Sequence, residues 1–421
     1  MSARARLATS ALSLAAIAAI VALLLAGATG GGHAAAVVVA PARACGGGTD
    51  AASLAATLAV AAQIKSGEHS GTAVLAARHT IESDRVLAAA VAAGDLATVR
   101  SEVTAIVFNH QHIVRLRILR GGVVVDDLGG PDVLAPVGGS LRSGGRVVGR
   151  FLMSIQDDAG YMKLAHRLAG AHTVVRYHGA TIMRDIGVSA ATALPVRGQI
   201  TLGTTTYLVG SIDIGRFPVG TLRISLLVRR PPAALARVSC ALVRAEVLAG
   251  VAERAYVESR SGSNVLNALG VIARASALRA ALASGDLATA AQLVRTMATG
   301  GGFGALRVLT VSGHLVADVS PSRPLVAPLS RPLLDTGGQL VGTAVLAVQS
   351  ARGYADLVHA LTQAQVVVRR GSRVLAETFT PPATIPDGGL ISWQGVRYAV
   401  ASFAGEQYPN RPIRIYVLAP G

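Results

Sequence analysis

The sequence predicts an α+β fold that is built twice in tandem behind an apolar N-terminal segment. Three observations carry this expectation: a repeat offset by about 191 residues, helical periodicity at the start of each copy, and β-branched strands after it. With 51% hydrophobic and 15% charged residues among its 421, the chain can bury a core. A disordered chain is excluded, because disorder combines low hydrophobicity with high charge.

The repeat is anchored by the string Gly-Asp-Leu-Ala-Thr, which occurs at residues 94–98 and again at 285–289. The following matches keep their order and spacing: Asp127 with Asp318, Tyr161 with Tyr354, Arg176 with Arg369, Tyr207 with Tyr398, and Pro218 with Pro409. The chain is therefore expected to hold two domains, residues 45–232 and 233–421, joined near Arg230-Pro231-Pro232.

Each copy is expected to open with Ala-rich helices and to continue with strands. The helices are predicted at residues 51–64 and 74–107 in the first copy, and at 235–257 and 265–297 in the second. The strands of the first copy are predicted at 113–119, 123–127, 147–155, 173–177, 205–212 and 222–228, with a short helix at 158–168. In the repeated string, the glycine is expected to end one helix and the aspartate to cap the next. Each copy is thus predicted to be a long N-terminal helix with one antiparallel sheet and one short helix.

The N-terminal residues 1–44 predict export. Arg4 and Arg6 precede the uncharged residues 7–26, which as a helix would span about 30 Å of hydrocarbon. The two arginines favour the cytoplasmic side, so the body is expected outside the cytoplasm. Two outcomes stay open: an uncleaved transmembrane anchor, which leaves the protein on the cell membrane, or a signal peptide cleaved near residues 42–44, which leaves it secreted.

Two cysteines, Cys45 and Cys240, precede the repeated string at matching distances in the two copies. An exported protein with an even cysteine count can form a disulfide, so these two residues are predicted to pair. Two buried thiols or an intermolecular bond are the alternatives.

The formal charge of +16 does not predict a nucleic-acid partner. Lys65 and Lys163 are the only lysines, and the arginines are spread along the chain without a basic run. Such a diffuse field favours attraction to an anionic envelope surface instead, and salt would screen it.

The order of elements resembles extracytoplasmic PAS-like sensor domains of the Cache type. The features that carry the resemblance are the turn at Gly121-Gly122 with its strand at 123–127, the Gly-Arg-Val-Val-Gly strand at 145–149, and the Val-Val-Arg strands at 174–176 and 367–369. The resemblance implies that a small molecule binds between the sheet and the short helix with its loops, and that binding shifts the long helix. Trp393, the sole tryptophan, has no counterpart in the first copy, which departs from the amino-acid-binding pattern of that family.

The candidate ligand site of each copy combines two tyrosines with one arginine. Arginine is a planar bidentate donor for a carboxylate or phosphate, and tyrosine offers an apolar body with one hydroxyl. The alternative is structural, with the tyrosines in the core and the arginines facing water. The candidates are Tyr161, Arg176 and Tyr207 in the first copy and Tyr354, Arg369 and Tyr398 in the second.

No catalytic residues, metal site or cofactor are predicted. The nucleophile-elbow, phosphate-loop and His-Glu-x-x-His patterns are missing from the sequence. His166 and His359 are expected on the solvated face of the short helix, and His110-x-His112 has no third ligand in view. An enzyme is therefore not expected.

Two functions remain in view. The first is an exported sensing or ligand-binding protein without its own output domain, which takes an unknown small molecule, with an anion favoured by the arginines. It would pass its signal to a separate signalling or envelope protein, with the N-terminal helix in the membrane. The second is a non-catalytic interaction or structural protein of the envelope that uses the same fold as a docking surface.

Overall fold

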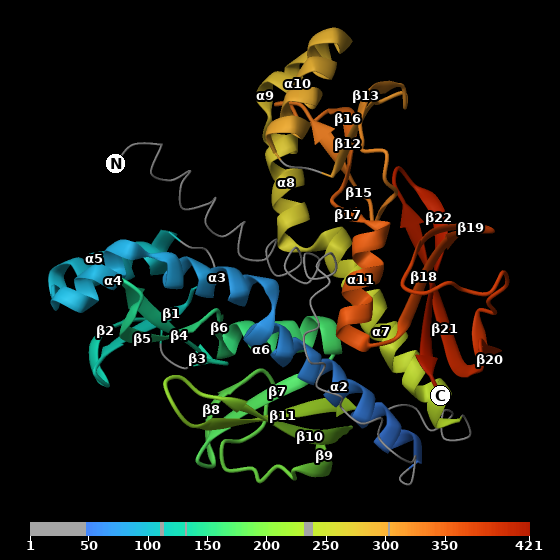
Figure 1. Cartoon of the computed structure of the whole chain (residues 1–421). Helices are drawn as coiled ribbons and strands as arrows, with labels where there is room; N and C mark the ends of the chain where they lie inside the picture. Colours follow the sequence, from blue (N-terminus) through green and yellow to red (C-terminus); the bar gives the residue numbers. More distant parts are fainter. Residues whose placement is uncertain (1–47, 110–112, 131–132, 231–238, 302–303) are drawn as a thin grey trace. The chain divides into compact units, whose positions relative to one another are not determined.

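The computed structural model describes residues 48–421 except 110–112, 131–132, 231–238 and 302–303 (Figure 1). The chain divides into two compact units, which meet in sequence between Val243 and Arg244. The expected leader, Cys45, His110 with His112 and the expected junction at 232–233 lie outside the described residues.

The first unit contains two large antiparallel sheets, a two-stranded pair of β3 with β6, and a set of leading helices. The helices are α2 (Gly48–Ser70), α3 (Thr72–Ser83), α4 (Arg85–Ala93) and α5 (Leu96–Asn109). The first sheet has the order β2-β1-β5-β4 and is formed by β1 (Arg115–Arg120), β2 (Val123–Gly129), β4 (Val137–Ser143) and β5 (Arg146–Ser154). The second has the order β8-β7-β11-β10-β9 and is formed by β7 (His172–Tyr177), β8 (Ala180–Arg184), β9 (Arg197–Leu202), β10 (Thr205–Gly215) and β11 (Thr221–Arg229). Between the sheets the chain forms β3 (Val133–Leu134), β6 (Gln156–Asp157), α6 (Asp158–Leu164) and the π-helix η1 (Ala165–Ala169).

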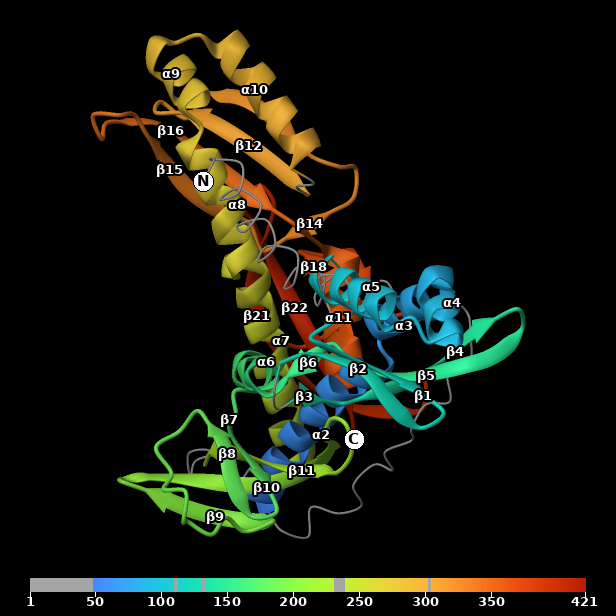
Figure 2. The same cartoon turned by 90° about the vertical axis from the view of Figure 1, so that its left-hand side faces the viewer.

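The second unit repeats these elements in the same order (Figure 2). Its helices are α7 (Cys240–Ser261), α8 (Ser263–Arg274), α9 (Ser276–Ser284), α10 (Leu287–Gly300) and the short α11 (Ala351–Thr362). Its first sheet, β13-β12-β16-β15, holds β12 (Ala305–Thr310), β13 (Leu315–Val319), β15 (Leu329–Leu334) and β16 (Leu340–Ala347). Its second sheet has seven strands, namely β14 (Leu325–Val326), β17 (Gln349–Ser350), β18 (Gln365–Arg370), β19 (Arg373–Glu377), β20 (Gly388–Trp393), β21 (Val396–Gln407) and β22 (Arg411–Pro420).

The expectation of one sheet per copy is wrong, because each unit has two large sheets, and the first unit has a further two-stranded pair, β3 with β6. Four strands before the short helix form the first sheet, and the strands after it form the second, which in the second unit is also joined by the two-residue strands β14 and β17. The helices divide in the same way: α3 to α5 pack on the first sheet of the first unit, and α2 packs on the second (Figure 1). Strand periodicity shows which residues alternate, but not which strands pair, so the sequence pattern is compatible with either arrangement.

The expected helix break at the repeated string is confirmed in both units. Gly94 ends α4 with φ of 76°, and the Asp95 carboxylate accepts the Thr98 N–H at 3.1 Å. Gly285 has φ of 75°, and Asp286 accepts from Thr289 at 3.1 Å. Each glycine occupies a left-handed conformation that disfavours other residues, which directs the next helix back over the sheet.

A charged contact links the two sheets of the first unit. Asp127 of β2 accepts from Arg115 at 2.9 and 3.0 Å and from Arg117 at 2.9 and 2.6 Å. Both guanidinium groups lie over the ring of Phe217, which follows the second-sheet strand β10. Burial raises the pKa of the Asp127 carboxyl, but the hydrogen bonds from Arg115 and Arg117 outweigh burial, so its pKa lies below the ordinary value.

The second unit forms the same link with different chemistry. Asp318 accepts from Arg307 at 3.0 Å and from the hydroxyl of Tyr408 at 2.7 Å, where Tyr408 stands in the place of Phe217. Asp127 and Asp318, which match each other in the repeat, thus both take part in contacts between the two large sheets of their unit.

Within the described residues, no single helix is both long and apolar enough to cross a membrane. By length and composition, one bent combination passes the same test: Cys240–Arg274 with Ser276–Ser284, at 54°.

Asp127→Asn is expected to destabilise the first unit by about 1–3 kcal/mol at neutral pH, because two half-buried guanidinium groups lose their shared carboxylate. Since the folded pKa is lowered, the carboxylate stabilises the fold above the unfolded pKa of about 3.9, and this contribution is lost as pH falls through the folded pKa. The difference in stability between wild type and variant should therefore become smaller below about pH 4. Hydrogen–deuterium exchange rates of the amides in β1 and β2, measured against pH, report this difference.

Asp213→Asn is the matched control. Asp213 pairs with Arg223 at 3.2 Å, but both side chains are about half exposed, and such pairs contribute roughly 0–1 kcal/mol. An equal loss in the two variants would contradict the role assigned to Asp127.

Candidate functional site

The six predicted site residues lie on two different sides of the second sheet in each unit. Tyr161 and Tyr354, from the short helices α6 and α11, are fully buried. Their hydroxyls donate to backbone carbonyls of the long helices, Tyr161 to Ala61 of α2 at 3.3 Å and Tyr354 to Ala252 of α7 at 2.6 Å. Burial raises the pKa of both hydroxyls, so they stay protonated.

The long helix approaches the second sheet closely on that side. A Cβ at Gly210 of β10 would lie 2.7 Å from Leu58 and 3.1 Å from Leu54, both on α2. Gly210 and Leu208 therefore face the helix. Since strand residues alternate, Tyr207 faces the opposite side of the sheet.

Arg176 and Tyr207 share this opposite face in the first unit. Tyr207 packs with a buried cluster of Val174, Val188, Val209 and Leu227. Arg176 donates to the hydroxyl of Thr181 at 3.2 Å and to the carbonyl of Thr192. Val188 and Thr192 belong to the connection between β8 and β9, residues 185–196, which we call the first covering loop.

Arg369 and Tyr398 occupy the same positions in the second unit. Tyr398 packs with Val367, Val400 and Leu418 of the sheet, and its ring centroid lies 5.8 Å from that of Phe379. Phe379 and the buried Ile385 belong to the connection between β19 and β20, residues 378–387, which we call the second covering loop.

The second covering loop is fastened to the sheet by polar side chains. Arg369 donates to the carbonyls of Pro382 at 2.6 Å and Ala383 at 2.7 Å. Trp393 donates to the carbonyl of Thr380 at 3.0 Å, and Ser402 donates to that of Asp387 at 2.7 Å. Trp393, which has no counterpart in the first copy, therefore fastens the start of the second covering loop.

The charge on these faces is unbalanced in the same way in both units. Arg176 lies opposite Arg223 in the strand register, and Arg369 lies opposite Arg414. Arg223 pairs with Asp213 and Arg414 with Asp387. In the described part of the chain, no carboxylate pairs with Arg176 or Arg369, and like charges across strands repel. Each covered face therefore holds an arginine that pairs with no carboxylate of the described residues.

Arg369 is the most enclosed of these arginines. The residue is 6% exposed, and its Nε has no hydrogen-bond partner within the described structure. A buried guanidinium that meets only neutral carbonyls keeps most of its desolvation cost. The geometry suits an anion better than the loop carbonyls that now contact it.

The structure places two of the three residues expected in each site on one face of the second sheet, but it does not bring them together. Arg176 pairs with Arg223 and Tyr207 with Arg229, six residues further along β11. Arg369 and Tyr398 are separated in the same way along β22, and Tyr161 and Tyr354 pack against the long helices. Sequence reasoning missed the covering loops. Their signal was apolar residues, such as Val188 and Ile385, inside segments otherwise rich in Pro, Gly, Thr and Ala.

A separate open depression of about 710 Å³ lies on the first sheet of the first unit. Arg78 of α3 and three glycines of β4 and β5, Gly138, Gly139 and Gly149, contribute to its wall. None of the six predicted residues lines it.

Arg369→Met is expected to free the second covering loop, because both bonds to its carbonyls are lost while apolar volume is kept. Exchange of the amides in residues 378–387 should accelerate about 5–30-fold, which corresponds to the ~1–2 kcal/mol of two hydrogen bonds. Hydrogen–deuterium exchange measures the change.

Arg373→Met is the control, since Arg373 is exposed at the start of β19. Unchanged exchange in Arg369→Met would show that the arginine does not fasten the loop.

No protein-family model matches the chain, and a search of curated proteins finds no match. Among solved structures, the periplasmic domain of LuxQ from Vibrio cholerae is similar over 42% of this chain and 100% of its own, with 11% identity and a TM-score of 0.29. The ligand-binding domain of the chemoreceptor CtaA from Pseudomonas fluorescens, solved with L-alanine, is similar over 42% of this chain and 96% of its own, with 11% identity and a TM-score of 0.25. An extracellular ligand-binding receptor from Desulfohalobium retbaense is similar over 52% of this chain and 47% of its own, with 10% identity and a TM-score of 0.23. These neighbours are periplasmic or extracellular sensor and ligand-binding domains, but TM-scores this low carry no argument for the function of this chain.

Proposed function

We propose that the chain is a non-catalytic, extracytoplasmic ligand-binding protein that senses a small anionic molecule at the covered face of a second sheet. One observation carries the proposal: Arg369 is 6% exposed, and in the described structure it bonds only to loop carbonyls. The ligand would supply the carboxylate or phosphate that this guanidinium lacks.

Binding would replace the loop rather than fill an existing cavity. A carboxylate can take two parallel N–H bonds from one guanidinium, and a charged acceptor bonds about twice as strongly as a neutral carbonyl. The Pro382 and Ala383 carbonyls would then return to solvent as the second covering loop moves outward. Val367, two residues before the arginine on the same face of β18, and Ile385 of the loop supply apolar surface on this face.

The two units would differ in how tightly they are closed. Arg176 is only half-buried and bonds to one hydroxyl and one carbonyl, whereas Arg369 is buried under two carbonyls. The first unit is therefore expected to open at lower cost, and the second to gain more from a charged ligand.

A movement of the second sheet would be transmitted to a partner protein through the long helix. Gly210 lies against Leu54 and Leu58, so a shift of β10 would press directly on α2. A separate signalling or envelope protein would read this movement, with the N-terminal apolar segment at the membrane. The covered face of the second unit offers a buried arginine and apolar residues to a ligand.

A thermal-shift screen of the full chain, purified under oxidising conditions, tests the proposal. Small mono- and dicarboxylates, amino acids and phosphates are the probes. A ligand at about 100 times its Kd stabilises the folded state by roughly 2.7 kcal/mol, which raises the unfolding midpoint visibly. The shift should disappear in Arg369→Met or Arg176→Met and persist in Arg373→Met.

The docking alternative is favoured by one observation. The covered face of the second unit is already filled by Phe379 and Ile385, as a closed structural core would be. No shift with any probe, while both arginine variants fold, would favour docking over sensing. A shift that survives both arginine variants would move the site elsewhere, with the depression beside Arg78 as the next place to substitute.

A further inference from the structure

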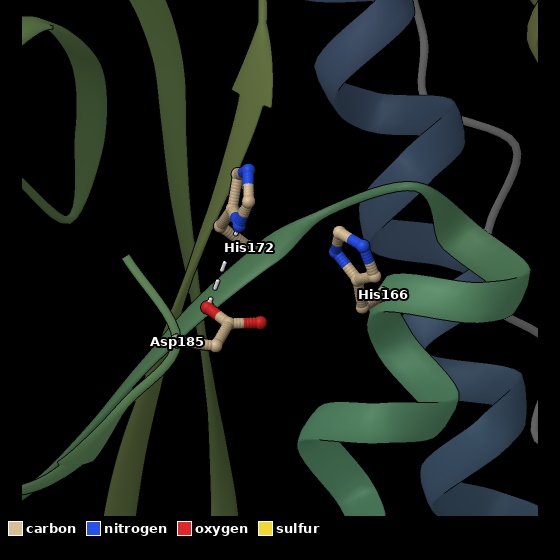
Figure 3. A group of neighbouring side chains, drawn as sticks. All are labelled: His166, His172 and Asp185. Atoms are coloured by element: carbon tan, nitrogen blue, oxygen red, sulfur yellow. Dashed lines mark ion pairs between the residues drawn. The ribbon is translucent and has the colours of Figure 1, made fainter. Parts of the chain in front are cut away.

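Three side chains of the first unit form a cluster beside Tyr207, at the start of the first covering loop. His166 lies on η1, His172 begins β7, and Asp185 directly follows β8 (Figure 3). The nearest donor atoms of the three residues all lie within 4.8 Å of one another. Nδ1 of His172 is 3.7 Å from Oδ1 of Asp185, and the two imidazole centroids are 5.1 Å apart.

Local structure holds these residues in place. Gly170 ends η1 with φ of 65°, which reverses the chain so that His166 and His172 meet. The Asp185 carboxylate accepts the N–H of Thr173 at 2.7 Å, which fixes one oxygen. The ring of Tyr207 meets His172 edge-on at 6.0 Å and limits its rotation.

One atom of the cluster is unsatisfied. Nδ1 of His172 is buried and has no hydrogen-bond partner in the described structure. Leaving a buried polar atom without a partner costs about 1–3 kcal/mol, so such an atom needs an explanation. A bound cation beside it would remove this cost.

In the second unit, the matching positions lack the second histidine and the carboxylate, and their side chains form hydrogen bonds with one another and with the backbone. His359, Gln365 and Thr378 correspond to His166, His172 and Asp185. The Thr378 hydroxyl donates to the side-chain oxygen of Gln365 at 2.8 Å and accepts the Val366 N–H at 2.8 Å. The His359 ring bonds to the carbonyl of Ala364 at 2.7 Å. The fold therefore needs neither a second histidine nor a carboxylate here.

We infer that His166, His172 and Asp185 bind a divalent first-row transition metal ion. Two imidazoles and one carboxylate are a donor set for Zn²⁺, Ni²⁺, Co²⁺ or Fe²⁺ with open positions for water or a ligand, whereas Mg²⁺ and Ca²⁺ prefer oxygen alone. Donors around one such ion lie roughly 3–3.5 Å apart, given metal–ligand distances of about 2.0–2.2 Å. Nδ1 of His172 and Oδ1 of Asp185, at 3.7 Å, are already near this spacing, and the exposed side chain of His166 can turn toward them. The site is separate from the anion proposed at Arg176.

Zn²⁺ titration of the full chain against a chromophoric chelator tests the inference. The double variant His172→Gln/Asp185→Thr imports the pair of the second unit, so it should fold like the wild type. We expect one Zn²⁺ per chain fewer in this variant, or a Kd raised more than about 100-fold, since loss of a mere supporting partner costs about 10–100-fold. His166→Ala should weaken binding as well, and Mg²⁺ should not compete.

His69→Gln removes an exposed histidine outside the cluster and is the control. Co²⁺ absorption bands in the visible range report the ligand set and should change in the cluster variants only. Equal Zn²⁺ binding by wild type and double variant would overturn the inference. So would unchanged binding in His166→Ala, or a loss in His69→Gln as large as in the cluster variants.

Discussion

In each unit, a buried contact between the short helix and the long helix fixes the position of the second sheet. Tyr161 and Tyr354 are the largest fully buried side chains of their units, and each bonds to a carbonyl of the long helix. The short helix stands between the two sheets in sequence, and the long helix covers the second sheet. Fixing one to the other therefore fixes where the second sheet begins. The contacts of Asp127 on β2 and Asp318 on β13, both edge strands of the first sheet, link the two sheets at a second place.

A consequence is that the two faces of the second sheet have different tasks. The helix side is closed mainly by apolar packing and by the hydroxyl bonds of Tyr161 and Tyr354, with Gly210 in the first unit where the second has Ala401. The other side is closed by a loop that an arginine holds. Arg176 is half-buried and Arg369 is buried, while His172 and Asp185 at the edge of the first loop become Gln365 and Thr378 in the second unit. The loop side therefore differs between the units in its charged and metal-ligating residues.

Predictions from sequence succeeded where the cause is local. Gly94-Asp95 ends one helix and caps the next through atoms within four residues, so the string alone was enough. The edge strands β4, β8 and β9 were missed, because the exposed, Gly-containing stretch at 137–143 and its counterparts lack a buried alternating pattern. The number of sheets and the position of the covering loops could not be predicted, because both depend on contacts between residues that are far apart along the chain. Likewise, the helical pattern predicts His166 only as a surface residue, because its neighbour His172 is brought beside it by the turn at Gly170, which that pattern does not describe.

The duplicated topology also bears on how the chain folds. Two sheets of the same strand order on one polypeptide meet at high local concentration, and tandem copies of one fold are prone to exchange strands before each is complete. The last strands also match in detail. Tyr207 is paired with Arg229 of β11 and Tyr398 with Pro420 of β22, and in each unit the next residue makes the ladder bond: Arg230 donates to the carbonyl of Thr206 and Gly421 to that of Arg397. Pro420 therefore costs β22 no ladder bond, and the hydrogen-bond pattern at this end does not distinguish one last strand from the other.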